Sequence, residues 1–491
     1  MPNIKKQISQ LKTGEELNQW IIKSSPKLLI SQSFLRKILL KLVKKYTYKS
    51  LLSDKKFPYQ VQLDKFYMGQ ALAKAVNKLL EQAKTHRTYR QAIESVLPAI
   101  LGVMREGPQK AKAFKEKYGF NPPGFLTISP TEFCNLKCIG CYANSSAAAS
   151  AKLDWDVVDR IITEKTKDWG SWFTVISGGE PLLWKSQGKT IIDIAKKHPD
   201  NFFLMYTNGT LIDKRMAQKL AEVGNITPAI SVEGFEKETD ERRGKGVHQR
   251  ILKAMGNLKE VGVPFGISLT ATRKNAEMIT SEKLIKYYWD KGAIYAWIFQ
   301  LMPIGRASFD LVVTPEQRLK MFRQTQKLIR KGYFMADFWN CGMISNGCIS
   351  AGKTTGGGYL YIEWNGNITP CVFNPYAAAN INEIYQRNGS LNEVLITPFF
   401  QRIKRWQEDY GLGKEPDQIQ NWILPCPIRD HYKKMREFID KDKPQPIDES
   451  AKQALQDKEY AEKMINYDKA LTEIFDPIWE EEYKSRKRVE K

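Results

Sequence analysis

The sequence predicts an α/β protein with a central parallel sheet, curled or doubly wound, and a site at the carboxyl ends of its strands. Six short apolar runs alternate with helical segments between residues 125 and 305. A group of cysteines directly follows the first run, where such a fold places its site. Segments of helical character precede and follow this part of the chain. We therefore expect an α/β core with additional helical modules.

The strands are expected where apolar and β-branched residues cluster. They are FLTIS from Phe125, Trp172–Ser177, Phe202–Thr207, Thr227–Val232, Phe265–Thr270 and Ile294–Leu301. Between them, segments such as RILKAMGNLKEVGV set apolar residues on one helical face. Gly224 suits the end of one helix, and Thr314 with Pro315 suits the start of another. Six strand and helix repeats follow from this alternation.

Residues 1–122 are expected to form a basic helical module. They contain 24 Lys+Arg and 8 Asp+Glu, so they carry 24 − 8 = +16 of the total charge of +22. In FLRKILLKLVKKY, the apolar face is Leu35, Ile38, Leu39, Leu42 and Tyr46, and the basic face is Arg36, Lys37, Lys41, Lys44 and Lys45. Such a helix either lies on an anionic surface such as a membrane or packs on its own domain with a solvated lysine face.

Breaks in the pattern predict the remaining boundaries. Pro122-Pro123-Gly124 separates the basic module from the α/β core, which we expect over residues 123–335. Asn365-Gly366 between two strand-like runs predicts a hairpin within an irregular unit over residues 336–431. A charged helical tail is expected over residues 432–491.

The start of the chain lacks the apolar region of a signal peptide, and no run of about 18 apolar residues predicts a membrane span. We therefore expect a cytoplasmic protein, which the basic module can also hold at the inner face of the membrane. In a reducing compartment, seven cysteines favour metal binding or catalysis over disulfides.

Cys134, Cys138 and Cys141 follow the first strand with the spacing C-x3-C-x2-C. Structural zinc takes four ligands, and none of the four histidines lies within 40 residues of this group. A redox C-x-x-C pair leaves Cys134 without a role. Three thiolates can instead hold three irons of a [4Fe–4S] cube and leave the fourth iron open to a small chelating ligand.

This motif resembles that of the radical S-adenosylmethionine (SAM) superfamily. The turns that resemble its SAM-binding motifs are SGGEP (Ser177–Pro181), TNG (Thr207–Gly209), SVEG (Ser231–Gly234) with Arg242 and Arg243, SLTAT (Ser268–Thr272) and QLMPIG (Gln300–Gly305). The resemblance implies a partial (β/α)6 TIM-like barrel. It implies SAM contacts from Gly178, Gly179, Glu180, Tyr142, Asn208, Ser231, Glu233, Arg242, Ser268 and Met302.

One position departs from the superfamily pattern, in which an aromatic residue precedes the third cysteine near the adenine. Here Gly140 occupies that position and Tyr142 follows Cys141. The chemistry that the resemblance implies is one-electron cleavage of SAM to methionine and a 5′-deoxyadenosyl radical, which abstracts hydrogen from a C–H bond. No catalytic side chain is assigned beyond the cluster site. A flavodoxin or ferredoxin is the expected reductant.

Four further cysteines, Cys341, Cys348, Cys371 and Cys426, suit a second [4Fe–4S] cluster. Their pattern resembles the SPASM or shorter twitch extension of radical SAM proteins. Full SPASM domains have seven such cysteines, whereas this chain has four, so one auxiliary cluster is expected. Buried thiols or a zinc ion held by four thiolates remain alternatives.

Three substrate classes stay open. The basic module favours a membrane-associated lipid. SPASM-type relatives more often modify peptides or proteins, but residues 1–122 show no hairpin pattern of a leader-binding winged helix. RNA is the third class, although no RNA-binding motif is present, and no DNA is expected. An iron–sulfur electron carrier would need neither GGEP nor six strand and helix repeats.

Overall fold

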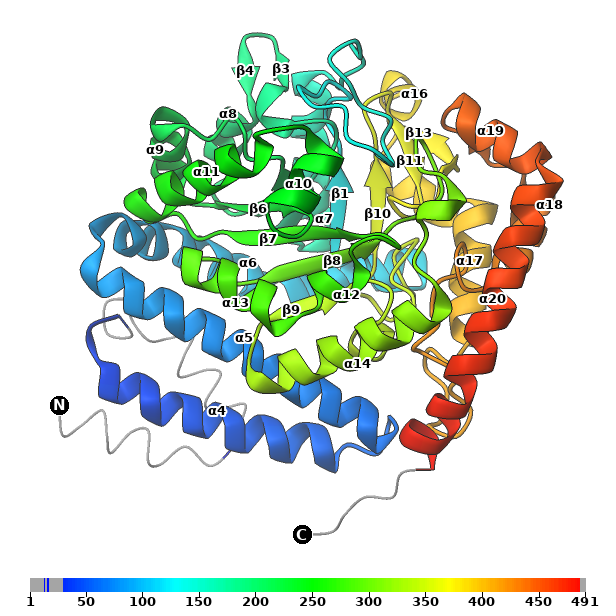
Figure 1. The fold of residues 1–491 in the computed structure, drawn as a ribbon, viewed down its shortest axis with the longest axis horizontal. Helices are drawn as coiled ribbons and strands as arrows, with labels where there is room; N and C mark the ends of the chain where they lie inside the picture. The colour runs from blue at the N-terminus through cyan, green and yellow to red at the C-terminus, as the bar shows by residue number, and fades with distance from the viewer. Residues whose placement is uncertain (1–12, 14–15, 17–29, 486–491) are drawn as a thin grey trace.

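The computed structural model describes residues 13, 16 and 30–485 of the 491-residue chain (Figure 1). Residues 1–12, 14–15 and 17–29, which belong to the predicted basic module, lie outside the described residues, as do residues 486–491 of the predicted tail.

A curled, mostly parallel sheet forms the centre of the molecule. Its order is β13-β11-β10-β1-β2-β5-β6-β7-β8-β9, and every neighbouring pair from β10 to β9 is parallel. The six predicted strands are all present within two residues of their expected bounds. They are β1 (Phe125–Ile128), β2 (Phe173–Ile176), β5 (Phe202–Thr207), β6 (Ile226–Val232), β7 (Gly266–Ala271) and β8 (Ala296–Gln300). The predicted α/β partial barrel is therefore confirmed.

Two strands that the sequence did not assign to the barrel extend this sheet at both ends. β9 (Met335–Asp337) pairs with β8, and β10 (Tyr359–Ile362) pairs in parallel with β1. The predicted Asn365-Gly366 hairpin joins β10 to β11 (Asn367–Thr369), and β13 (Ala379–Asn380) lies beyond β11. A turn signal is local, whereas the partner of a strand depends on tertiary packing. The hairpin of the cysteine-rich unit thus continues the barrel sheet.

Helices cover the outer face of this sheet (Figure 1). Helix α14 begins as predicted, because Thr314 accepts a hydrogen bond from the backbone N–H of Gln317. Gly224 ends α9 in the left-handed conformation that favours glycine. The covering helices are α7 (Trp155–Trp169), α8 (Ile191–Lys197), α9 (Lys214–Val223), α10 (Glu236–Arg243), α11 (Val247–Val261), α12 (Ala276–Ile279), α13 (Glu282–Lys291) and α14 (Pro315–Lys331).

The described part of the N-terminal module consists of α4 (Ser33–Ser53), α5 (Tyr59–Thr85) and α6 (Arg87–Tyr118). On α4, buried side chains of the predicted apolar face include Leu35, Leu39 and Tyr46, and the exposed basic side chains include Lys37, Lys41, Lys44 and Lys45. Arg36 departs from the predicted basic face. It is buried, and its Nη1 donates to the backbone oxygen of Ile30 (2.7 Å).

The C-terminal part returns to the N-terminal module. Helix α20 runs along the side of the barrel (Figure 1), and in the turn after it the Tyr483 hydroxyl donates to Oδ2 of Asp64 on α5 (2.6 Å). The elements beyond β9 include α15 (Gly342–Ser345), α16 (Ile381–Gln386), α17 (Pro398–Asp409), α18 (Tyr432–Asp442), α19 (Glu449–Gln456), α20 (Lys458–Ile478) and a two-stranded pair, β12 (Tyr376–Ala377) with β14 (Gln445–Pro446).

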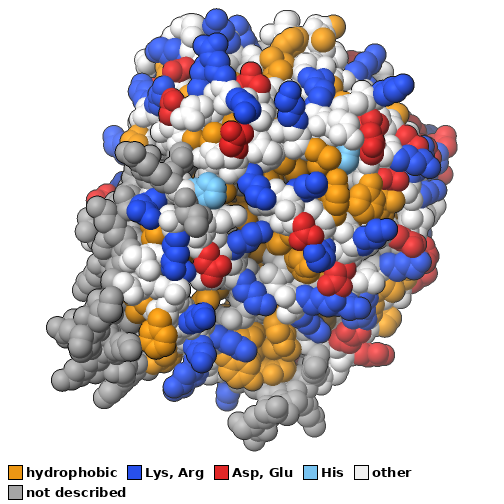
Figure 2. Space-filling view, turned by 60° about the vertical axis from the view of Figure 1, so that its left-hand side comes forward, with side chains coloured by type: hydrophobic (Ala, Val, Ile, Leu, Met, Phe, Trp, Pro, Cys, Tyr) orange, Lys and Arg blue, Asp and Glu red, His pale blue; other side chains and the backbone are white. Residues whose placement is uncertain are grey.

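Within the described residues, no helix has the length and apolar character needed to cross a membrane. Figure 2 shows one face of the molecule, on which Lys and Arg side chains are widely spread with apolar side chains between them.

Candidate active site

A cavity of about 560 Å³ brings the two groups of cysteines together. Alternate side chains of the parallel strands line it, such as Phe125 and Thr127 of β1 or Phe173 and Val175 of β2, as expected for the inside of a barrel. Its lining residues include all seven cysteines: Cys134, Cys138, Cys141, Cys341, Cys348, Cys371 and Cys426. The sequence predicted each group separately, but not that both face one space.

The loop that contains Cys134, Cys138 and Cys141 follows β1, and neighbouring segments hold its backbone. The backbone N–H of Ile139 donates to the oxygen of Arg242 (3.0 Å), and that of Arg306 donates to the oxygen of Cys141 (3.0 Å). Gly140 has a φ of +65°, and an added Cβ would lie 2.9 Å from the Leu301 side chain. This close approach accounts for glycine where the superfamily pattern has an aromatic residue.

Tyr142 lines the cavity directly after this loop. Its hydroxyl lies 2.9 Å from the Ser177 hydroxyl, and its ring packs against that of Phe373 with centroids 5.8 Å apart. Burial raises the pKa of Tyr142 to about 12, so the hydroxyl stays protonated at neutral pH. Tyr142 therefore connects the cysteine loop, the glycine-rich turn after β2 and the auxiliary cysteine region.

Two polar side chains direct hydrogen-bond donors at sulfurs of this loop. Nδ2 of Asn208 lies 3.8 Å from Sγ of Cys134, and Nη1 of Arg243 lies 3.9 Å from Sγ of Cys138. Burial raises the pKa of Cys134 to about 11. A bound metal would overcome this effect, because it holds a coordinating thiol as thiolate. The guanidinium of Arg243 would stabilise the same anionic form.

The glycine-rich turn after β2 packs directly on the backbone that precedes Cys134. The N–H of Gly179 donates to the oxygen of Thr131 (2.8 Å), and the N–H of Glu180 donates to that of Phe133 (2.9 Å). An added Cβ on Gly179 would lie 2.3 Å from the oxygen of Phe133. Only glycine fits this contact, and it leaves the backbone of Gly178 and Gly179 facing the cavity.

Eight of the ten predicted SAM contacts line the cavity, and the two glutamates do not. Glu180 is fully buried behind the wall, where its carboxylate accepts from the Thr207 hydroxyl (2.8 Å) and the Asn208 N–H (2.8 Å). Glu233 is also fully buried and pairs with Arg242 and Arg243. Both carboxylates thus hold cavity-lining side chains in place. The lining members are Gly178, Gly179, Tyr142, Asn208, Ser231, Arg242, Ser268 and Met302.

The four auxiliary cysteines come from separate segments. Cys341 immediately precedes α15, Cys348 follows that helix, Cys371 ends the hairpin, and Cys426 lies between α17 and α18. Backbone N–H groups face two of the sulfurs, since Ser350 N lies 3.5 Å from Sγ of Cys348 and Phe373 N lies 3.3 Å from Sγ of Cys371. Such donors favour anionic sulfur.

Burial raises the pKa of all four auxiliary thiols, to about 12 for Cys341 and Cys371. The charge of Asp430, followed by those of Cys348 and Cys371, further raises the pKa of Cys426. For Cys341 the neighbouring charge is Asp337. Among the described residues, no three His, Cys, Asp or Glu side chains converge closely enough to hold a single metal ion.

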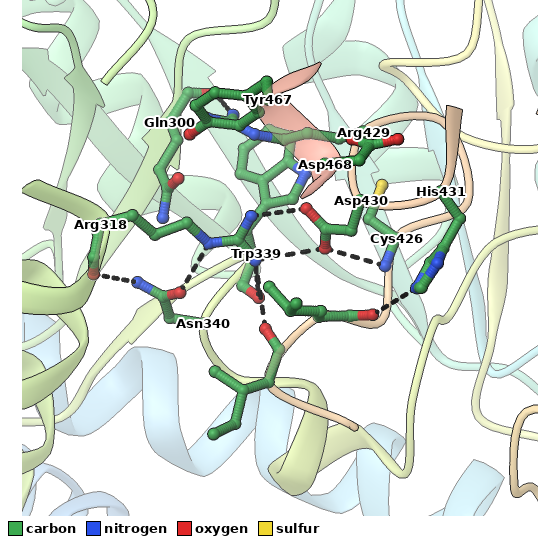
Figure 3. Close-up of polar contacts among 12 residues, drawn as sticks. Gln300, Arg318, Trp339, Asn340, Cys426, Arg429, Asp430, His431, Tyr467 and Asp468 are labelled. Atoms are coloured by element: carbon green, nitrogen blue, oxygen red, sulfur yellow. Dashed lines mark hydrogen bonds and ion pairs between the residues drawn. The ribbon is translucent and has the colours of Figure 1, made fainter. Parts of the chain in front are cut away.

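A buried polar network fixes the loop that carries Cys426 (Figure 3). The Cys426 N–H donates to Oδ2 of Asp430 (3.1 Å), and the Asp430 N–H donates back to the Cys426 oxygen (2.7 Å). Arg318, on α14, forms a bidentate ion pair with Asp430, and both side chains are fully buried. Sequence analysis did not predict this pair, because its members lie 112 residues apart.

The cavity wall is rich in aromatic side chains. The aromatic side chains that line it are Phe125, Tyr142, Phe173, Tyr206, Trp297, Phe299, Phe334, Phe338, Trp339, Tyr359 and Phe373. Met68 of α5 also contributes, so the N-terminal module forms part of the wall. A site of this composition suits an apolar ligand with few polar groups.

Comparison with known families identifies the domain that holds this site. Residues 128–279 match the family model described as the Radical SAM superfamily. This segment is a radical SAM domain. The matched segment contains the three-cysteine loop, the glycine-rich turn and the Arg242-Arg243 pair.

Curated relatives share the domain at modest identity. The chain is 27% identical over 288 residues to an AdoMet-dependent heme synthase of Methanosarcina barkeri. This alignment covers 54% of this chain and 80% of that protein. It is 28% identical to an Fe-coproporphyrin III synthase of the same organism, over 52% of this chain and 61% of that protein. It is also 29% identical to the mycofactocin maturase MftC of Mycolicibacterium smegmatis, over 42% of this chain and 52% of that protein.

Among solved structures, SuiB of Streptococcus suis bound to its precursor peptide SuiA is 20% identical, with a TM-score of 0.48 over 60% of this chain and 70% of that chain.

Radical SAM enzymes use a [4Fe–4S] cluster and SAM, and SPASM-type relatives carry additional clusters. The residues of this chain fit the first requirement. The three-thiol loop faces the cavity beside exposed glycine backbone, with N–H donors directed at two of its sulfurs. The auxiliary cysteines fit the second, because their four thiols border the same cavity and backbone N–H groups face two of them.

Proposed function

We propose that this radical SAM enzyme binds its SAM-cleaving cluster through Cys134, Cys138 and Cys141, an auxiliary cluster through Cys341, Cys348, Cys371 and Cys426, and its substrate in the cavity between them. The observation that carries the proposal is that one cavity is lined by all seven cysteines and by the glycine-rich turn.

When bound, the first cluster and SAM supply the 5′-deoxyadenosyl radical that abstracts hydrogen from the substrate. In this proposal, Asn208 and Arg243 stabilise the thiolates through their N–H donors. The backbone of Gly178 and Gly179 and the side chain of Arg242 bind the polar part of SAM. Tyr142 contacts SAM from the side of the auxiliary region, and the aromatic wall excludes water from the radical.

The aromatic lining supports an apolar substrate, and we propose a lipid chain. The exposed lysines of α4 supply a means of reaching it, because Lys37, Lys41, Lys44 and Lys45 share one helix and Met68 of the adjacent α5 reaches the cavity wall. Each lysine near an anionic membrane surface contributes roughly 1 kcal/mol to binding.

A second candidate substrate is a tetrapyrrole, which the similarity to the heme synthase and the Fe-coproporphyrin III synthase favours. A large flat apolar ring also suits an aromatic wall. The similarity to the mycofactocin maturase favours a peptide instead. Neither candidate accounts for the basic face of α4.

Vesicle pelleting distinguishes these classes at the first step. We expect the protein to sediment with anionic vesicles but not with neutral vesicles at low salt. Replacing Lys37, Lys41, Lys44 and Lys45 by Gln should abolish sedimentation, whereas replacing the exposed Lys433, Lys441, Lys443 and Lys458 should not. Equal loss in both variants would indicate only a net-charge effect and would contradict a role for α4.

Transfer of the substrate's hydrogen provides the second test. The loaded enzyme is incubated with perdeuterated membrane lipid, with coproporphyrin or with peptide, and 5′-deoxyadenosine is examined by mass spectrometry. Deuterium in the product from lipid supports the proposal. Turnover stimulated by coproporphyrin or peptide alone would replace the lipid with that class.

A further inference from the structure

A buried side chain joins the loop of Cys426 to residues 300–302, which also line the cavity. Arg429 is 1% exposed and lies three residues after Cys426. Its Nη1 donates to the backbone oxygens of Gln300 (3.3 Å) and Leu301 (3.2 Å) and lies 3.9 Å from Sδ of Met302. Its Nη2 donates to the Tyr467 hydroxyl on α20 (3.1 Å). Figure 3 shows Arg429 between Tyr467 and Trp339.

The segment that Arg429 holds, residues 300–306, also holds the three-cysteine loop. The N–H of Arg306 donates to the oxygen of Cys141 (3.0 Å), and its Nη2 donates to the oxygen of Cys138 (3.4 Å). The Leu301 side chain occupies the space beside Gly140. Residues 300–306 therefore contact the auxiliary loop through one end and the SAM-cluster loop through the other.

The Cys426 side of this connection is rigid. All three nitrogens of the Arg318 guanidinium have acceptors: Nε donates to Asn340 (3.0 Å), Nη1 to Asp430, and Nη2 to Asp430 (3.2 Å) and to the oxygen of Ile423 (3.1 Å). Asp430 in turn fixes the backbone of Cys426. Because Arg318 and Asp430 hold the loop at one end, we expect a change at Cys426 to move the loop at Arg429.

We propose that Arg429 is a positioning residue that couples the two halves of the active site, so that ligation at Cys426 strengthens SAM binding through residues 300–306. The inference rests on the proposed function, because it assumes that Cys426 binds the auxiliary cluster and that SAM binds beside Met302. Coupling of this kind is reciprocal, so SAM should also slow loss of the auxiliary cluster. No covalent or redox step is required.

A double-mutant cycle tests the coupling on the anaerobically reconstituted full chain. SAM affinity is measured by equilibrium dialysis for the wild type, Cys426→Ser, Arg429→Lys and the double variant, with iron determined for each. Lysine keeps the buried charge but cannot donate to two backbone oxygens and Tyr467 in the same planar geometry. We expect Cys426→Ser to weaken SAM binding roughly tenfold in the wild-type background and less than twofold beside Arg429→Lys.

The matched control is Tyr467→Phe, which removes the acceptor of Nη2 and leaves the contacts to Gln300 and Leu301 intact. It should not change SAM affinity or the effect of Cys426→Ser. Additive effects in the cycle, or an equal loss of affinity in Tyr467→Phe, would overturn the coupling. Thermal unfolding of each variant identifies global destabilisation, and Arg429→Gln replaces Arg429→Lys if the latter does not fold.

The proposed function and the coupling fail in different ways. If the wild type binds no SAM or its Cys134→Ala variant still cleaves SAM, the proposed function is wrong. If the wild type cleaves SAM and the cycle is additive, only the coupling is wrong.

Discussion

Cys134, Cys138 and Cys141 lie within one eight-residue loop, whereas Cys341, Cys348, Cys371 and Cys426 come from four segments between residues 341 and 426. The sulfurs of the loop are close in sequence, and backbone contacts together with the side chains of Arg242 and Arg306 hold its backbone. The auxiliary group depends on a hairpin, a one-turn helix and a loop that the distant Arg318 anchors through Asp430. A compact ligand set is therefore kept together mainly by its own short loop, whereas a dispersed one depends on elements that are far apart in the sequence.

Among changes that affect one cysteine group and not the other, Asp430→Ala is expected to lower the unfolding free energy most. This change leaves the Arg318 charge buried and unpaired, which costs about 3–5 kcal/mol of unfolding free energy. Urea unfolding measures the loss, and iron analysis should show that the auxiliary site is depleted first. The exposed Arg323–Glu482 pair, whose side chains are 46% and 42% accessible, supplies the control. Glu482→Ala should cost about 0–1 kcal/mol, and a cost equal to that of Asp430→Ala would contradict the assigned role of burial.

The unfolding free energy should depend on pH through Asp468 on α20, on the auxiliary side of the molecule. Burial raises the pKa of this carboxyl to about 8 in the folded protein, against about 3.9 when unfolded. Between these values the unfolded chain releases a proton that the folded chain keeps. Stability is therefore lost as pH rises from about 4 to about 8, by up to about 1.4 kcal/mol per pH unit.

The variant Asp468→Asn removes this contribution and keeps an acceptor for the backbone N–H of Tyr432, which Asp468 binds. Its stability relative to the wild type should increase steadily across the same pH range in urea titrations. A constant difference between the two proteins from pH 5 to pH 8 would show that Asp468 titrates normally.

A smaller effect is expected at the three-cysteine loop from Arg243→Gln. The guanidinium beside Cys138 favours the cluster state that carries more negative charge, which is the reduced state. Its loss should make reduction of the SAM-cleaving cluster roughly tenfold less favourable, a shift of about 59 mV to lower potential. Redox titration followed by electron paramagnetic resonance measures it in a Cys426→Ser background. Arg250→Gln, a change at an exposed arginine, should leave the potential unchanged.

The smallest effect is expected from Tyr142→Phe, which removes the hydrogen bond to Ser177. A buried hydrogen bond contributes about 0.5–1.5 kcal/mol, so SAM affinity should fall by about two- to tenfold while iron content stays constant. Ser177→Ala should have a similar effect, and the double variant should be no weaker than either single one. Independent effects of the two changes would show that the pair does not act as a unit.

The sequence predicted much of the fold because strand and helix signals are local. The six barrel strands and the capping of α14 by Thr314 followed from composition and spacing. The parallel pairing of β10 with β1 did not, since nothing in YLYIEW specifies its partner. The three-cysteine loop could also be predicted, because its cysteines are close together in the sequence. The Arg318–Asp430 pair, Arg243 beside Cys138 and the shared cavity depend on contacts across distant segments.

The burial of Glu180 and Glu233 gives a second lesson about motifs. Sequence predicted that both carboxylates contact SAM, and in the structure both are buried and hold residues of the cavity wall. Their contact with SAM stays a prediction. A motif thus identifies a turn with its close packing, but not the buried partners of its side chains.

The most direct test of the two-cluster site compares the wild type with Cys134→Ala and Cys426→Ala after anaerobic reconstitution. Iron is counted, and 5′-deoxyadenosine is measured after SAM and dithionite are added. The account predicts about eight irons per chain in the wild type and about four in Cys134→Ala. It also predicts 5′-deoxyadenosine from the wild type and none from Cys134→Ala, while Cys426→Ala loses auxiliary iron and keeps detectable cleavage. Cleavage of SAM by Cys134→Ala, or iron content unchanged in both variants, would contradict it.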